Sequence, residues 1–219
     1  MTKSLLYGLG VLASILLLTA SLLGWIANSW QEVATLISGC WCIWLVVKEH
    51  IWNWPIGLVT STFSAYVLYE ARFFADSILN VLYFILGLFG WYWWLHGGKN
   101  RAEVAISRIG KGEAAALLMA AALTTFVWSR VLIHYNGAAP VIDALTTSTS
   151  LAAQYMTTKK YLESWVVWIV VDLIYVPLFF WRGLDLLAIL YFIYLVLAVA
   201  GHYEWIGRYR QVEATRQPC

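Results

Sequence analysis

The chain has 219 residues, of which 62% are hydrophobic and only 12% are charged, and its formal net charge is +2 at pH 7. A soluble domain carries roughly 25% charged residues, so the composition excludes a soluble enzyme and a nucleic-acid-binding domain. Two of its three cysteines lie in an apolar segment, where a free thiol behaves as a small hydrophobic group. We therefore expect no structural disulfide, metal site or cofactor.

Apolar segments of membrane-spanning length recur along the chain. The first is too long for the core of a signal peptide and lacks a clean cleavage site, so we interpret it as a helix. The sequence predicts an all-α polytopic membrane protein. Its eight transmembrane helices are expected at residues 5–27, 33–47, 52–69, 73–95, 113–135, 139–157, 163–182 and 184–206.

Positive charges are unevenly divided between the connections. If these alternate between two sides, one side holds only Arg72, Arg130 and Arg182. The positive-inside rule then places the other side, with both termini, in the cytoplasm. That side collects Lys3, Lys48, Lys99, Arg101, Arg108, Lys111, Lys159, Lys160, Arg208, Arg210 and Arg216.

An internal repeat becomes visible when the chain is shifted by 111 residues against itself. Four crossings separate the two copies, so both enter the membrane from the same side and the repeats are parallel. A chance offset between aromatic-rich segments is the alternative. The shift superimposes Lys48 on Lys159, Trp54 on Trp165, Tyr83 on Tyr194, and the segment GWYWW (90–94) on GHYEW (201–205).

The repeat divides the chain into four parts. We expect an additional N-terminal helix in 1–32, a first three-helix repeat with a cytoplasmic loop in 33–112, a linker helix in 113–138, and a second repeat with a cytoplasmic tail in 139–219. Transporters built from such repeats bind substrates at the repeat interface, near the bilayer midplane.

Several of these apolar segments carry a polar stripe on one helical face. A polar stripe facing lipid is unfavourable, so it faces protein or water. Helix packing explains hydroxyl groups alone, but converging stripes from both repeats favour a substrate pathway. The stripes comprise Asn53, Gly57, Thr60, Ser61 and Ser64; Asp76, Asn80 and Tyr83; Asp143, Thr147, Ser150 and Gln154; and Trp165, Trp168, Asp172 and Tyr175.

Asp172 is the most informative single residue, because a carboxylate inside a membrane span is a functional candidate. Its aromatic neighbours resemble a cage for a delocalised or quaternary cation. A proton or Na⁺ site and a structural acid bonded to a nearby Trp or Tyr are the alternatives. Asp76 and Asp143 lie nearer helix ends, where an interaction with the helix dipole is expected. Trp25, Trp30, Trp94 and Trp205 lie near the expected interfaces, where Trp anchors helices.

Residues 33–206 resemble the PnuC-type nicotinamide riboside transporters of bacteria. The resemblance is carried by Trp-Asn-Trp-Pro-x-Gly from Trp52, by Asn-x-x-Tyr at Asn80 before Gly-Trp-Tyr-x-Trp, and by Gln-x4-Lys-Lys-x2-Glu-x-Trp-x2-Trp from Gln154. It implies a three-plus-one-plus-three helix core related to the SWEET sugar transporters. The helix at 5–27 is additional to that core, and the family pattern favours Asn where this chain has Asp172.

The same resemblance implies a homotrimer in the bacterial inner membrane that takes up nicotinamide riboside by facilitated diffusion, while a cytoplasmic kinase traps the substrate. Related carriers for thiamine or riboflavin remain an alternative. A membrane-embedded enzyme is a further one, although no phosphate-binding loop or zinc motif occurs. Lys159 either gates the cytoplasmic end or only satisfies the positive-inside rule. The expected substrate-binding residues are Trp52, Trp54, Thr60, Ser61, Ser64, Asn80, Tyr83, Gln154, Lys159, Trp165, Trp168, Asp172, Tyr175, Tyr191 and Tyr194.

Overall fold

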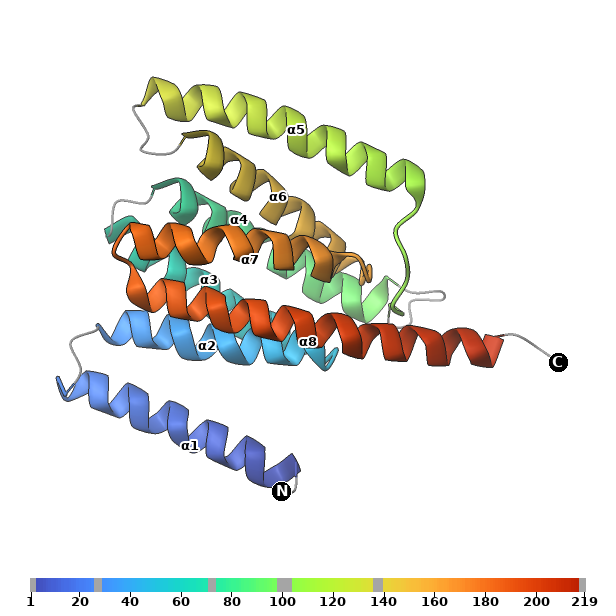
Figure 1. Ribbon diagram of the computed structural model, residues 1–219. Helices are drawn as coiled ribbons and strands as arrows, with labels where there is room; N and C mark the ends of the chain where they lie inside the picture. Colours follow the sequence, from blue (N-terminus) through green and yellow to red (C-terminus); the bar gives the residue numbers. More distant parts are fainter. Residues whose placement is uncertain (1–2, 26–28, 71–73, 98–103, 136–139, 217–219) are drawn as a thin grey trace.

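The computed structural model describes residues 3–25, 29–70, 74–97, 104–135 and 140–216, and these residues form eight helices and no strand (Figure 1). The predicted all-α fold and its helix count are confirmed. The last helix runs on to Arg216 instead of ending at 206. The helices are α1 (Lys3–Leu22), α2 (Trp30–Val47), α3 (Asn53–Glu70), α4 (Phe74–His96), α5 (Lys111–His134), α6 (Pro140–Thr158), α7 (Ser164–Trp181) and α8 (Asp185–Arg216).

Five helices among the described residues are long and apolar enough to cross a membrane: α2, α4, α5, α7 and α8. The polar side chains predicted to form stripes lower the hydropathy of α3 and α6. Arg72, Lys99 and Arg101, which contribute to the predicted charge asymmetry, lie outside the described residues.

Local sequence signals set the helix boundaries. Ser29 and Glu32 form a capping box at the start of α2, which satisfies backbone N–H groups that the first turn leaves free. Pro55 lies in the first turn of α3, where a missing N–H costs little. Gly183 ends α7 with a φ of 71°, a left-handed conformation that glycine adopts without steric cost.

Six helices form a closed ring, in which α2 packs on α3, α3 on α4, α4 on α6, α6 on α7, α7 on α8, and α8 back on α2. The two remaining helices lie outside the ring: α1 packs on α2, α5 packs on α6, and they lie at opposite edges of the bundle (Figure 1). Successive helices alternate in direction, and α8 extends beyond the other helices at its C-terminal end (Figure 1).

The start of α5 is fixed to the turn between α6 and α7. The hydroxyls of Tyr155 and Tyr161 donate to the Glu113 carboxylate at 2.8 and 2.7 Å. Partial burial and the neighbouring carboxylate raise the pKa of Tyr161, so this phenol stays protonated as a donor. Ser107 also pairs with this turn, since its N–H donates to the Lys160 carbonyl at 3.1 Å.

Two turns in equivalent positions have the same unusual backbone. Glu49, before α3, has a φ of 55°, and Lys160, before α7, has a φ of 54°. In each turn the next residue donates its N–H to a carbonyl five residues earlier, at 2.9 Å in both cases. No other non-glycine residue in the described ranges has a positive φ.

Two tryptophan pairs are also equivalent. Trp54 packs edge-on against Trp94 with ring centres 5.4 Å apart, and Trp165 packs edge-on against Trp205 at 5.3 Å. Trp94 is 2% exposed and Trp205 is fully buried, so the prediction that they anchor helices at the membrane interface is wrong.

Glycines explain why these tryptophans are buried. A side chain at Gly90 would collide with the Trp54 ring, and one at Gly201 would collide with the Trp165 ring. Each glycine therefore leaves room for an indole from the neighbouring helix. That indole packs against the tryptophan that lies one turn after the glycine. Trp25 and Trp30 are exposed, as expected of interface residues.

Candidate functional site

A cavity lies inside the ring of six helices. Its wall consists mainly of aromatic rings, hydroxyls and amides, with an aliphatic remainder. The lining residues are Cys42, Ile43, Val46, Asn53, Trp54, Gly57, Thr60, Ser61, Ser64, Leu68, Asn80, Tyr83, Gly87, Ser150, Gln154, Thr157, Trp165, Trp168, Asp172, Tyr175, Phe179, Leu187, Leu190, Tyr191, Tyr194 and Ala198.

The cavity brings together all of the predicted site residues except Trp52 and Lys159. Trp52 is 60% exposed. The Lys159 ammonium lies 3.6 Å from the centre of the Trp93 ring, which holds it by a cation–π contact. These two residues were predicted because they lie close to site residues in the sequence. Only side chains that point into the ring of helices form the wall, and neither of the two does so.

The α3 stripe serves both of the roles expected from sequence. The Thr60 hydroxyl donates to the Ile56 carbonyl at 3.0 Å, the back-bonding that packing helices use. Thr60, Ser61 and Ser64 nevertheless all line the cavity. On α4, the Asn80 amide donates to the Asp76 carbonyl at 2.9 Å, which fixes the orientation of its side chain beside the cavity.

Asp172 is 2% exposed and is the one acidic residue in the wall. No lysine, arginine or histidine from the described part of the chain lines the cavity. A buried carboxylate costs free energy unless a partner compensates its charge. A positively charged occupant would compensate this carboxylate when it is ionised.

An aromatic cluster covers one side of the cavity. Tyr191 lies 4.9 Å from Tyr175 and 5.4 Å from Tyr194, measured between ring centres, and Phe179 stacks on Tyr175 at 5.2 Å. The faces of such rings attract cations and stack on flat heteroaromatic rings. Buried indole N–H groups of Trp54 and Trp165 have no hydrogen-bond partner among the described residues.

Sequence reasoning missed Thr157, whose hydroxyl accepts a hydrogen bond from the Trp168 indole at 2.9 Å. Thr157 lies at the end of its predicted helix, where nothing marks it as part of a site. Cys42 and Phe179 were missed because a small or apolar wall residue has no signal in a single sequence.

Charged residues cluster at the end of the ring where α4 and α6 begin. Arg182 donates to both carboxylate oxygens of Asp143, at 2.8 and 2.9 Å. The Tyr175 hydroxyl lies 3.4 Å from the Asp76 carboxylate. Asp143 is therefore an ion-pair partner of Arg182, in addition to the helix-dipole role expected from its position.

Apolar helices that surround a polar and aromatic cavity are the arrangement typical of a membrane transporter. The chain belongs to the nicotinamide mononucleotide transporter family, whose model matches residues 29–207. The predicted resemblance to PnuC-type transporters is confirmed. The match begins at residue 29, after the end of α1 at Leu22.

Curated relatives match most of the chain. The nicotinamide riboside transporter PnuC of Escherichia coli K12 is 26% identical over 84% of this chain and 87% of its own length. PnuC of Neisseria mucosa is 28% identical over 81% and 72%. The riboflavin/roseoflavin transporter RibM of Streptomyces davaonensis is 26% identical over 83% and 87%.

A solved structure has the same fold. The crystal structure of the vitamin B3 transporter PnuC matches with a TM-score of 0.73 at 24% sequence identity, over 93% of this chain and 92% of the other. The family match and the curated relatives identify the protein as a multi-pass membrane protein of a bacterial transporter family.

Proposed function

We propose that this protein carries nicotinamide riboside across the membrane and binds it in the cavity inside the six-helix ring. The observation that carries the proposal is the isolated carboxylate of Asp172 in a wall that has no cationic side chain. The nicotinamide ring of the riboside is a pyridinium cation, which complements both the carboxylate and the aromatic faces.

The same wall discriminates between the riboside and its 5′-phosphate. A phosphate group carries a charge of about −1.5 to −2 near pH 7, and proteins bind it with Arg, Lys or backbone N–H groups. The described lining offers no Arg or Lys to bind this group, and an ionised Asp172 would repel it. The riboside is therefore favoured over the mononucleotide.

Amide and hydroxyl groups suit the rest of the molecule. The carboxamide of nicotinamide and the hydroxyls of ribose need donors and acceptors, which Asn80, Gln154, Ser61 and Ser64 supply from the wall. Trp168 and the tyrosine cluster supply flat surfaces for the ring.

Two parallel three-helix repeats form the transport core in this proposal, with α2–α4 in one, α6–α8 in the other, and α5 as the linker. The two left-handed turns, the two buried tryptophan pairs and the matching helix contacts support this division. All eight helices span the membrane, and α1 is additional to the core.

Transport occurs by facilitated diffusion, through alternating exposure of the cavity to the two sides of the inner membrane. No nucleotide-binding motif occurs in the sequence to drive active transport. The termini lie in the cytoplasm, the protein is a homotrimer, and a cytoplasmic riboside kinase traps the product. These points rest on the positive-inside pattern and on the family resemblance.

A flavin is the second candidate substrate, because one relative is a riboflavin/roseoflavin transporter. Riboflavin is an uncharged aromatic molecule and gains nothing from Asp172. Uptake of radiolabelled nicotinamide riboside into proteoliposomes, with riboflavin, thiamine or nicotinamide mononucleotide as competitors, tests the proposal. We expect competition only from unlabelled riboside; no riboside uptake, or full competition by riboflavin, would contradict it.

A further inference from the structure

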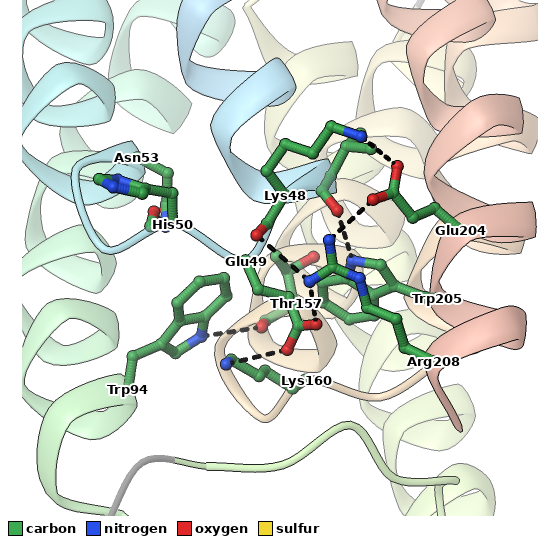
Figure 2. A network of polar contacts seen from close by, with 11 residues as sticks. Lys48, Glu49, His50, Asn53, Trp94, Thr157, Lys160, Glu204, Trp205 and Arg208 are labelled. Carbon is green, nitrogen blue, oxygen red and sulfur yellow. Dashed lines mark hydrogen bonds and ion pairs between the residues drawn. The ribbon is translucent and has the colours of Figure 1, made fainter. Parts of the chain in front are cut away.

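At the end of the ring opposite Asp143, a network of ion pairs connects the turns after α2 and α6 to helix α8 (Figure 2). The Glu49 carboxylate lies 3.2 Å from the Lys160 ammonium and 2.8 Å from the Arg208 guanidinium. The Glu204 carboxylate accepts from Lys48 at 2.6 Å and from Arg208 at 2.7 Å.

Most of these contacts cross between the two halves of the ring. Glu49 and Lys48 follow α2, whereas Lys160 follows α6, and Glu204 and Arg208 belong to α8. Only the pair between Arg208 and Glu204 lies within one helix. If the halves move apart at this end, the other three ion pairs must separate together.

A layer of tryptophans lies between this network and the cavity. The Lys160 ammonium lies 4.3 Å from the centre of the Trp94 ring, and the Trp94 indole donates to the Thr157 carbonyl at 3.3 Å (Figure 2). Trp205 donates to the Val47 carbonyl at 3.3 Å. Trp94 and Trp205 pack in turn on the cavity-lining Trp54 and Trp165, so tryptophans and then charges close this end.

We propose that Glu49 and Lys160 form the latch of the gate that closes this end of the transport pathway. Their side chains are 17% and 5% exposed. Removing Glu49 leaves the buried Lys160 ammonium without its ion-pair partner, and removing Lys160 leaves the Glu49 carboxylate with Arg208 as its only cation in the network. Either change destabilises the closed arrangement. In an open arrangement both groups are hydrated, so the same change costs little there and shifts the equilibrium toward the open state.

The backbone supports a functional role for both residues. Each adopts a left-handed conformation that costs free energy in residues other than glycine, and such conformations concentrate at functional and switching sites. The two residues also occupy equivalent positions, 111 apart in the chain, so the latch forms between corresponding turns of the two halves.

The thiol of Cys42 can be used to measure how often this gate opens. Cys42 lines the cavity, so a cationic, membrane-impermeant methanethiosulfonate reagent reaches it from the cytoplasmic side only when the gate opens. In a C40S/C219S background, Cys42 is the remaining cysteine of the chain. Labelling rates are measured with the reagent on either side of oriented vesicles, for the parent and for Glu49→Gln, Lys160→Gln and both together.

We expect each single variant to label about tenfold faster from the cytoplasmic side, a change in the open population that a loss of about 1.4 kcal/mol produces. The double variant should label no faster than the single ones, because both changes remove the same contact. Lys160→Arg keeps the charge and should behave as the parent. Lys111→Gln removes an exposed charge outside the network and should also leave the rate unchanged.

Unchanged labelling in both Glu49→Gln and Lys160→Gln would overturn the latch, as would faster labelling from the opposite side only. If Lys160→Gln does not fold, Glu49→Gln and Arg208→Gln carry the test, because they remove contacts of the same carboxylate. The inference rests on the proposed transport function, which uptake by the parent protein tests separately.

Discussion

The indole nitrogen of Trp168 lies 2.9 Å from the hydroxyl oxygen of Thr157, and this contact joins the cavity wall to its closed end. The carbonyl of the same threonine accepts the Trp94 indole at 3.3 Å, directly behind the Glu49–Lys160 pair. Thr157, at the end of α6, thus connects the cavity-lining indole of Trp168 with the tryptophan layer of the proposed gate.

Thr157→Val should therefore weaken riboside binding about fivefold, since a hydrogen bond of about 1 kcal/mol is lost and the Trp168 ring is no longer fixed. Isothermal titration calorimetry measures the change. Thr157→Ser keeps the hydroxyl and should bind as the parent does. Equal affinity in the valine variant would show that this contact does not position the ring.

Asp172→Asn should lower riboside affinity by more than tenfold, because it removes the one negative charge in the wall while it preserves the size of the side chain. Riboside binding that is nearly unchanged would assign the acid a structural role instead.

Asn80→Ala and Gln154→Ala should each reduce riboside affinity about tenfold without loss of folding, since the ligand's polar groups then enter the wall unpaired. The control is Thr62→Ala, an exposed residue on α3 whose hydroxyl bonds only to the Leu58 carbonyl. Parental affinity in both variants, with normal thermal stability, would remove the amides from the site.

Gly201→Ala should lower the free energy of unfolding by about 1–3 kcal/mol, the usual cost of overpacking a filled core. The added carbon would lie against the Trp165 ring in the second buried tryptophan pair. Gly207→Ala is a matched control in the same helix, because nothing lies within 4 Å of the added atom. Thermal unfolding in detergent should separate the two variants; equal midpoints would contradict the packing role of Gly201.

Much of the fold was predictable because hydropathy marks helices in a membrane protein directly. The polar stripes also identified most of the polar side chains in the cavity wall, since a polar face in an apolar helix must find protein or water. Hydropathy does not separate an interface tryptophan from a buried one, and Trp94 and Trp205 were misplaced for that reason.

Charge pairs between different helices could not be predicted from a single sequence. The pairing of Asp143 with Arg182 and of Glu49 with Lys160 depends on which helix ends meet, and neither charge pattern nor helix period contains that information. Lys159 and Lys160 are adjacent in sequence, yet only Lys160 turns into the network, because its left-handed backbone redirects the side chain.

The most direct test of the central claim is calorimetric titration of the purified protein with nicotinamide riboside and, separately, with nicotinamide mononucleotide. The isolated carboxylate and the absence of a cation from the described wall predict micromolar or tighter binding of the riboside and no measurable binding of its phosphate ester. Equal or tighter binding of the mononucleotide would contradict the claim that this cavity selects a cation.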